Sequence, residues 1–372
     1  MRWSAPLPSL DGGNWSFHPR RLFLMRAKPR DAVTYGIDIG KTVFHVAGTD
    51  SAGHVVQQIR LSRHTLLEFF ANAAPARIGM EACPGSQWLA RKLRTLGHAV
   101  HIMPAQFVKP YVKSNKNDAI DARAIAEAVT RPDMRFVQIK GLEQIEIQAI
   151  HRIRERLMGA RTAIINQMRA FLLECGIPVH QGPGRFKADF QDIISDDTND
   201  VSPLIRTLLL ELRGELRSVE ERIEALNHRV AAHALQDELT RRLITIPGIG
   251  NLTASALTAA VGDGHQFRSA RDMAAWLGLV PAQYSTGGKP TLLGISKRGN
   301  GYVRRLLIHG ARACVIHLDR SKDRLGRWIT ALEARMHRNK VVVALANKLA
   351  RIAWVLMTRK GVLYEKCSTP MA

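Results

Sequence analysis

Acidic residues are scarce in this chain of 372 residues. Only 32 Asp and Glu stand against 54 Lys and Arg, so the formal net charge is +22 and the isoelectric point is near 10.6. The imbalance is strongest between residues 268 and 360, where 19 Lys or Arg accompany 4 Asp or Glu. A positive field of this size indicates a polyanionic partner, and we predict double-stranded DNA. A basic composition without functional meaning remains an alternative.

Cysteines and long apolar runs are also few. The four cysteines are far apart and give neither the paired spacing of zinc ligands nor a dense disulfide framework; they are Cys83, Cys175, Cys314 and Cys367. They indicate a reducing compartment, and we predict a cytoplasmic protein. No apolar run approaches the roughly 18 residues of a membrane span, so we predict no membrane association. The length indicates two or more domains.

Two N-terminal segments differ in pattern. Residues 1–32 contain Pro, Gly, Trp and Arg in no period and predict a disordered extension. Residues 33–140 predict three hairpin strands, followed by alternating helices and strands. The predicted strands are 33–39, 43–49, 55–61, 77–80 and 99–103, and the predicted helices are 64–74, 86–96 and 118–130. This order is typical of an α/β ribonuclease H-like, or RuvC-like, domain.

The remaining chain is predominantly helical in pattern. Residues 141–235 predict two long helices separated by a loop at 176–202, and apolar residues from Leu212 to Val230 repeat every four and three positions. That period predicts a coiled-coil hairpin, although two helices of a globular bundle fit equally well. Residues 236–365 predict a mostly α C-terminal domain. It starts with Ile246-Pro247-Gly248-Ile249-Gly250, which is typical of a helix-hairpin-helix whose backbone amides around Gly248 and Gly250 contact DNA phosphate. A plain glycine connection is the alternative.

Four carboxylates in the α/β segment form the first candidate site. Asp38 and Glu81 lie at the ends of predicted strands, and Asp118 and Asp121 share one face at the start of a predicted helix. Burying carboxylates is costly unless they are paired or bind cations, so their gathering indicates hard divalent ions. Two such ions could serve phosphodiester chemistry, with Mg²⁺ as the natural occupant. Taken alone, Asp118 could simply cap its helix.

The hairpin Gly36–Lys41 allows a rival interpretation. Sugar kinases and actin-like ATPases hold nucleotide phosphate and metal with a similar Asp-x-Gly hairpin. Such an enzyme would also need a second glycine-rich phosphate hairpin and an adenosine site. Neither is found further along the sequence, so we favour the nuclease-like interpretation.

The second candidate site is a loop in the basic C-terminal domain. Its residues combine hydroxyls, glycines and cations, in the order Ser285, Thr286, Gly287, Gly288, Lys289, then Lys297 and Arg298, with Arg304 and Arg305 following. Glycines let backbone amides approach a phosphate, the cations neutralise its charge, and an exposed hydroxyl can attack phosphorus. A hairpin that only binds backbone phosphate is the alternative. His309 is the nearest candidate base.

Together these motifs resemble a known family. Gly-Ile-Asp-Ile-Gly-Lys, Gly-Met-Glu-Ala, Asn-Asp-Ala-Ile-Asp-Ala-Arg, Ile-Pro-Gly-Ile-Gly and Val-Pro-Ala-Gln-Tyr-Ser-Thr-Gly-Gly-Lys occur in this order between Tyr35 and Gly361. The combination resembles the DEDD transposases of the bacterial insertion-sequence family numbered one hundred and ten, which are bridge-RNA-guided recombinases. The extension at residues 1–32 has no counterpart in that pattern.

The resemblance implies a mechanism. It makes Asp38, Glu81, Asp118 and Asp121 a metal-binding tetrad and implies a serine that attacks DNA to give a covalent phosphoserine. We assign this serine to Ser285; Thr286 is the alternative, because some relatives carry the serine one place later. The resemblance further implies a homo-oligomer, a dimer or tetramer, in which one subunit completes the site of another. A noncoding guide RNA would pair with donor and target DNA.

The leading hypothesis is thus a DNA recombinase that excises and inserts its own element. A second hypothesis is a RuvC-like junction nuclease in which water attacks and the serine loop only binds DNA. A third is a non-catalytic nucleic-acid scaffold. The three differ in their products, because only the first leaves protein attached to DNA.

Overall fold

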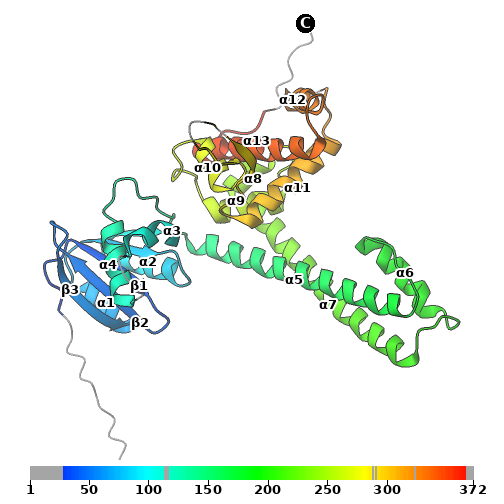
Figure 1. Ribbon diagram of the computed structural model, residues 1–372, viewed down its shortest axis with the longest axis horizontal. Helices are drawn as coiled ribbons and strands as arrows, with labels where there is room; N and C mark the ends of the chain where they lie inside the picture. The colour runs from blue at the N-terminus through cyan, green and yellow to red at the C-terminus, as the bar shows by residue number, and fades with distance from the viewer. Residues whose placement is uncertain (1–27, 113–116, 287–288, 290, 322–323, 366–372) are drawn as a thin grey trace, which may run out of the picture. The chain divides into compact units, whose positions relative to one another are not determined.

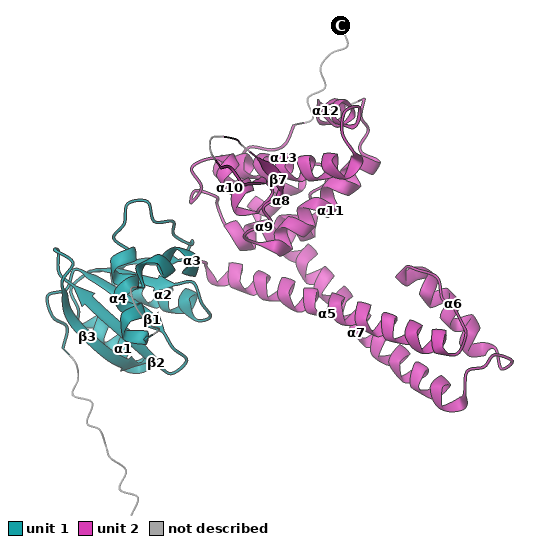
Figure 2. Ribbon diagram, in the orientation of Figure 1, with its two compact units in different colours: residues 1–139 teal, residues 140–372 magenta. Residues whose placement is uncertain are grey.

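The computed structural model describes residues 28–112, 117–286, 289, 291–321 and 324–365. It divides into two compact units, residues 1–139 and 140–372 (Figure 2). Most of the predicted extension, residues 1–27, lies outside the described residues. Its last residues are held against the first unit, since the Arg30 amide donates to Gln57 Oε1 and Gln57 Nε2 donates to the Lys28 carbonyl.

The first unit, coloured blue to cyan in Figure 1, is built on a five-stranded sheet with the order β3-β2-β1-β4-β5. The strands are β1 (Thr34–Ile39), β2 (Val43–Thr49), β3 (Val55–Ser62), β4 (Arg77–Glu81) and β5 (Ala99–Met103). The first three strands form an antiparallel meander, while β4 runs parallel to β1 and β5 runs parallel to β4. This mixed sheet is compatible with the predicted ribonuclease H-like arrangement.

Helices cover both faces of the sheet (Figure 1). On one face, α1 (Arg63–Ala71) and α2 (Ser86–Thr95) share an apolar core with Tyr35, Ile37 and Phe44 of the strands. On the other face lies α4 (Asp118–Ala128), which follows the short α3 (Ala105–Val108) and the 3₁₀ turn η1 (Lys109–Tyr111). Side chains alternate along a strand, so the residues between those core positions face α4.

Two glycines bring α4 close to the sheet. Gly36 of β1 and Gly79 of β4 lie opposite each other in the strand register. A Cβ atom on Gly36 would lie 2.1 Å from the Ala122 carbonyl oxygen, and one on Gly79 would lie 2.8 Å from the Val129 Cβ. The absence of both side chains therefore sets the distance between α4 and β1, and with it the position of Asp118 relative to Asp38.

Gly36→Ala is expected to destabilise the first unit by about 1–3 kcal/mol, the usual effect of an extra methyl group in a packed interior. The new methyl group would meet backbone atoms of α4, which cannot move aside as a flexible side chain would. Thermal unfolding of the purified protein measures this. Gly159→Ala is the control, because nothing lies within 4 Å of its added Cβ and alanine favours a helix interior. Equal unfolding temperatures for the two variants would contradict this account.

The second unit begins with a helical arm. It consists of α5 (Leu142–Glu174), α6 (Pro183–Ser195) and α7 (Pro203–Gln236). The long helices are antiparallel: Ile147 shares a small core with Val230, and Arg154 Nε donates to Asn227 Oδ1 at 2.7 Å. Most of the predicted apolar repeat, Leu216, Val219, Ile223, Leu226 and Val230, is buried. Whether the pair supercoils as a coiled coil stays a prediction.

The prediction of a loop over residues 176–202 is wrong. α6 occupies 13 of these residues, and Phe186 and Phe190 are buried against the arm. Pro183 at the first turn, where a missing amide costs nothing, begins this helix. In the sequence, the Asp residues that follow Ser195 favoured a loop, although the two phenylalanines have the i, i+4 spacing of a helix.

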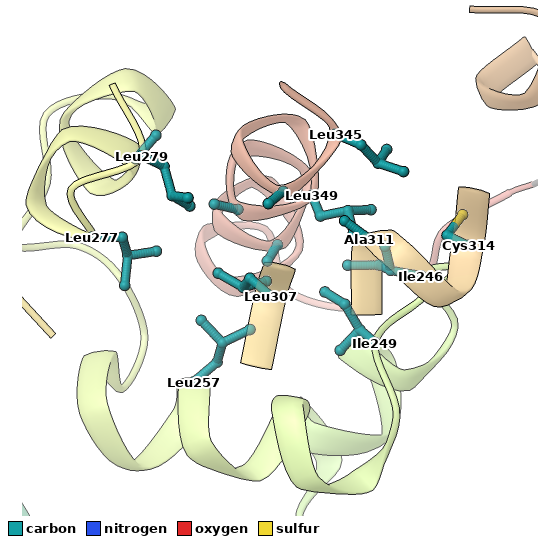
Figure 3. Close-up of a cluster of buried hydrophobic side chains, with 14 of the residues drawn as sticks. Ile246, Ile249, Leu257, Leu277, Leu279, Leu307, Ala311, Cys314, Leu345 and Leu349 are labelled. Atoms are coloured by element: carbon teal, nitrogen blue, oxygen red, sulfur yellow. The ribbon is translucent and has the colours of Figure 1, made fainter. Parts of the chain in front are cut away.

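The rest of the second unit is a helical domain with one small hairpin. Its elements are α8 (Glu238–Ile244), α9 (Asn251–Val261), α10 (Ala270–Trp276), β6 (Pro281–Gln283), β7 (Leu292–Ile295), α11 (Gly301–His317), α12 (Arg324–Glu333) and α13 (Arg338–Thr358). Leu257, Leu307 and Leu349, from three different helices, extend into one shared core (Figure 3).

The helix α13 is apolar enough to cross a bilayer by length and composition, and no other helix in the described part of the chain meets that criterion. Its most apolar stretch has a mean hydropathy of 1.6, and half of that stretch is buried within the fold. Val341, Leu345, Leu349 and Ala353 are buried in the core of the helical domain. A central core helix accounts for this composition.

Candidate active site

Strand order and register place the predicted carboxylates of the first unit. β1 and β4 are parallel neighbours in which Ile37 pairs with Met80, so Asp38 and Glu81 follow side by side at the same edge of the sheet. Ile37 and Met80 are fully buried on the α1 and α2 face. By alternation, Asp38 and Glu81 therefore both face α4.

The other two carboxylates begin α4. Asp118 and Asp121 lie in its first turn, where the helix dipole favours negative charge. The N-cap of this helix is Asn117, whose Oδ1 accepts from the Ala119 amide at 3.0 Å. Asp118 is thus not the cap that one interpretation of the sequence allowed, and its side chain, 58% exposed, is available for another role.

Distances between side-chain atoms show which of these carboxylates lie close together. Asp38, His45 and Asp118 each offer one ligand atom, and these three atoms lie within 4.8 Å of one another. Glu81 lies near the same place: burial raises the pKa of the Cys83 thiol, and the negative charges of Asp38 and Glu81 raise it further. The structure therefore brings Asp38 together with Asp118, and the strand order puts Glu81 next to Asp38, but Glu81 and Asp121 lie outside the group of three ligand atoms. Asp121 is one turn along α4 from Asp118.

His45 was not among the residues predicted from the sequence. It lies on β2 directly opposite Asp38 in the antiparallel register, and its Nδ1 is 3.6 Å from Asp118 Oδ2. The sequence did contain a signal for it. A hairpin that turns at Gly40 and Lys41 pairs Asp38 with Val43, and side chains alternate along a strand, so His45, two residues further on, falls on the same face as Asp38.

The serine loop projects from a two-stranded hairpin. β6 and β7 pair in antiparallel fashion, and the Tyr284 amide donates to the Thr291 carbonyl. Ser285 and Thr286 are exposed. Ser285 Oγ accepts a hydrogen bond of 2.8 Å from Gln283 Nε2, and the Lys289 amide donates to the Thr286 carbonyl. Gly287 and Gly288 lie outside the described residues.

Ser285 has no acidic or histidine hydrogen-bond partner within the described part of the chain. His309, the predicted candidate base, is exposed on α11, and no described hydrogen bond joins it to Ser285. Gln283 can orient the serine but cannot accept its proton, because an amide is not a base at neutral pH. The loop alone therefore presents a nucleophile without a base.

The predicted phosphate-binding cations fall into two groups. Lys289, Lys297 and Arg298 are exposed. Arg304 Nη1 donates to the carbonyls of Leu277 and Arg298 at 2.9 and 2.7 Å, and Arg305 pairs with Glu155 of α5. Arg304 thus anchors the loop backbone in this structure. The phosphate-binding role of these five residues stays a prediction.

The turn between α8 and α9 contains the other predicted DNA contact. Gly248 has φ +83°, and a Cβ there would lie 2.6 Å from the Gly310 carbonyl oxygen of α11. Conformation and packing thus both require glycine at position 248. Gly250 differs: it caps α9 at φ −94°, it is exposed, and nothing lies within 4 Å of an added Cβ. Packing therefore explains the glycine at position 248 but not the glycine at position 250.

A buried polar network joins α5 of the arm to α9 and α11. His151 of α5 is 3% exposed, and its ring nitrogens lie 3.0 Å from Tyr302 Oη of α11 and 3.0 Å from Ser255 Oγ of α9. Ser255 Oγ donates its single hydrogen to the Asn251 carbonyl at 2.7 Å. His151 Nε2 must then donate to Ser255, and Nδ1 accepts from Tyr302. The bond from Tyr302 requires an Nδ1 without a proton, and therefore a neutral imidazole.

Burial lowers the pKa of His151 to about 4, with further lowering by the charges of Arg154 and His233. The unfolded chain binds the proton near pH 6.5, so the second unit keeps its full stability above that pH. It should lose about 3 kcal/mol as the pH falls towards 4. Urea unfolding between pH 7 and pH 4.5 measures the loss. His151→Gln should remove most of this pH dependence, whereas His228→Gln, which alters an exposed histidine of α7, should retain it. An unchanged slope in His151→Gln would refute the assignment.

Comparison with known proteins identifies the class of enzyme. The family described as "Transposase IS116/IS110/IS902 family" matches residues 240–325. A second transposase family model, the DEDD transposase of IS110 type, matches residues 35–177. The first match contains the serine hairpin, and the second contains all four carboxylates. Both candidate sites thus lie in regions that match transposases, enzymes that cut and rejoin DNA.

Similar proteins extend over nearly the whole chain. A probable family 20 transposase of Pseudomonas aeruginosa is 45% identical over 90% of this chain and 98% of its own length. The transposases of insertion sequence IS1328 of Yersinia enterocolitica and IS1111A of Coxiella burnetii are 44% and 41% identical, over 89% and 95% of this chain and 98% and 97% of their own lengths. The chain belongs to the IS110/IS116/IS902 family of insertion-sequence transposases. The recognition made from the sequence motifs is confirmed.

Proposed function

We propose that this transposase cuts and rejoins DNA through a covalent bond to Ser285, with divalent cations held by Asp38, Glu81, Asp118 and Asp121. The observation that carries the proposal is the gathering of Asp38 and Asp118 within 4.8 Å on the α4 face, combined with an exposed serine on a separate basic hairpin. Both parts lie in a chain whose family acts on DNA.

The donor atoms of the first unit suit a hard divalent cation. Carboxylate oxygens are the ligands that Mg²⁺ prefers, and carboxylates this close repel one another unless a cation lies between them. Mg²⁺ bound there would stabilise charge on the oxygens of the phosphodiester. The protein itself contributes by positioning the carboxylates. The close packing of α4 over Gly36 supports this by holding Asp118 near Asp38, and Asp121 and Glu81 would complete the site.

The serine step is a transesterification. Ser285 Oγ forms a bond to phosphorus, the bond from phosphorus to one sugar oxygen breaks, and that sugar leaves as a hydroxyl. In the reverse step the hydroxyl of another strand attacks the phosphoserine and releases Ser285. The DNA is thereby rejoined, and the energy of the phosphodiester bond is conserved. Gln283 orients the nucleophile through its hydrogen bond. The proton of Ser285 goes to a base outside the hairpin, and a proton returns to the leaving sugar oxygen; we propose that the first unit of a second copy supplies this base.

This requirement supports a homo-oligomer, a dimer or tetramer in which one subunit completes the site of another. A noncoding guide RNA would choose donor and target by base pairing, and the exposed cations Lys289, Lys297 and Arg298 would hold phosphates without reading sequence. The exposed Gly250 amide would add a phosphate contact at the start of α9. The reaction would take place in the cytoplasm, without a membrane. Sequencing RNA that copurifies with the protein tests the guide, and RNA with no segment complementary to the element's ends would argue against it.

Trapping of the reaction products separates the proposal from its alternatives. Incubation with Mg²⁺ and DNA carrying the element's junction, followed by denaturing electrophoresis, should show DNA strands attached to protein. EDTA should prevent their formation. A junction nuclease, favoured if the serine only binds phosphate, would instead release free nicked strands. A scaffold would leave the DNA intact, and either of these outcomes would reject covalent catalysis.

A further inference from the structure

The side chain of His45 faces the candidate metal centre rather than the core. Its neighbours on β2, Phe44 and Val46, are buried on the α1 and α2 face, so alternation directs His45 to the face where Asp38 lies opposite it. The His45 side chain is only 15% exposed, yet it makes no hydrogen bond to any described residue. A mostly buried imidazole without a hydrogen bond needs another explanation.

Its distances are those of ligands around one ion. The His45 Nδ1 to Asp118 Oδ2 separation of 3.6 Å is too long for a hydrogen bond. Two ligands of an ion with bonds near 2.1 Å lie about 3 Å apart when adjacent and about 4 Å apart when opposite. The three candidate atoms of Asp38, His45 and Asp118, all within 4.8 Å of one another, need only small adjustments to reach that geometry.

We propose that His45 is a direct ligand of the cation held by Asp38 and Asp118, and that its nitrogen makes this position prefer Mn²⁺ to Mg²⁺. The inference rests on the proposed metal site and adds a donor outside the four carboxylates. Mg²⁺ binds oxygen ligands and keeps its waters. Mn²⁺ also takes oxygen ligands, but as a first-row transition ion it accepts an imidazole nitrogen more readily than Mg²⁺ does. One position of the centre therefore selects its ion by a nitrogen ligand.

The test is electron spin-echo spectroscopy of Mn²⁺ added to the full-length protein. Wild-type protein should show ¹⁴N modulation from a coordinated imidazole. His45→Gln should lose that modulation and bind Mn²⁺ at least about tenfold more weakly, while its Mg²⁺ affinity changes less than about threefold. His64→Gln is the matched control, because His64 is 84% exposed on α1 and lies beside Glu68 rather than the tetrad; it should behave as wild type.

Each outcome decides a separate question. If wild-type protein binds Mn²⁺ without ¹⁴N modulation, His45 is not a ligand and the inference is overturned, while the carboxylate site stands. If wild-type protein binds neither Mn²⁺ nor Mg²⁺, the proposed metal site itself fails. Should His45→Gln fold poorly, wild-type protein with ¹⁵N-labelled histidine settles the matter, since the ¹⁴N signal must then change to that of ¹⁵N.

Discussion

Ser285→Ala protein is expected to form no covalent adduct with DNA and to lose strand joining by at least about 10³-fold, as when a nucleophile is removed from an enzyme that depends on it. The variant lacks the Oγ that bonds to phosphorus, and water on an exposed hairpin is a poor substitute. Affinity for DNA should change little, because the exposed cations Lys289, Lys297 and Arg298 remain. Denaturing gels with labelled junction DNA measure the adduct, and filter binding measures affinity.

Thr286→Ala is the matched control for this experiment. Thr286 is exposed on the same hairpin and also carries a hydroxyl, but Ser285 is the one oriented by Gln283. The Thr286 variant should keep its adduct within about threefold of wild type. The reverse result, with an adduct in Ser285→Ala and none in Thr286→Ala, would move the nucleophile to Thr286. Adducts in both variants would remove the nucleophile from these two residues.

Asp38→Asn should abolish DNA cleavage by at least about 10³-fold while leaving DNA binding intact. The substitution keeps the size and shape of the side chain but removes a negative charge that lies within 4.8 Å of the Asp118 and His45 ligand atoms. An amide is a weaker ligand for a hard cation, so metal affinity should fall together with activity. Cleavage assays across a Mg²⁺ titration, with calorimetry of metal binding, measure both effects.

Asp133→Asn is a suitable control because Asp133 is an exposed aspartate of the same unit, after the end of α4. It makes the same change in net charge without touching the sheet edge. Its activity should stay within about twofold of wild type, as expected for a surface substitution. Full activity of Asp38→Asn at saturating Mg²⁺, or an equal loss in both variants, would show that Asp38 is not part of a metal centre.

Local patterns predicted most of the first unit because each element there has a short, regular signature. The apolar strands between Val33 and Met103 and the helix starting at Asp118 follow the predicted order, with ends shifted by a few residues. The long helices α5 and α7 were predicted for the same reason: their apolar residues repeat over many turns. These signals depend on neighbours in sequence, which a single chain provides.

Features that depend on distant contacts were missed or only partly seen. The proposed role of His45 depends on Asp38, its partner across the hairpin, and on Asp118, which lies 73 residues further along the chain. α6 was predicted as loop, because its two buried phenylalanines find their core only on the neighbouring long helices. Arg304 was predicted only as a phosphate ligand, yet it binds two carbonyls of its own domain. Composition could not reveal these partners.

Gly248 and Gly250 also differ in ways that depend on distant contacts. The sequence predicted Gly248 and Gly250 as one DNA-binding pair, whereas their surroundings separate them. Gly248 packs against Gly310 of α11, which is remote in sequence, while Gly250 meets nothing within 4 Å. A motif can thus contain one residue fixed by the fold and one available to a ligand, and only the tertiary structure distinguishes them.

The four carboxylates must share metal ions for the proposed reaction, and anomalous diffraction from crystals grown with Mn²⁺ tests this most directly. We predict an anomalous peak at the edge of the sheet, within bonding distance of Asp38 and Asp118, with Glu81 and Asp121 bound to it or to a second peak about 4 Å away. The absence of any peak there, with Mn²⁺ bound at another surface of the protein, would contradict the account.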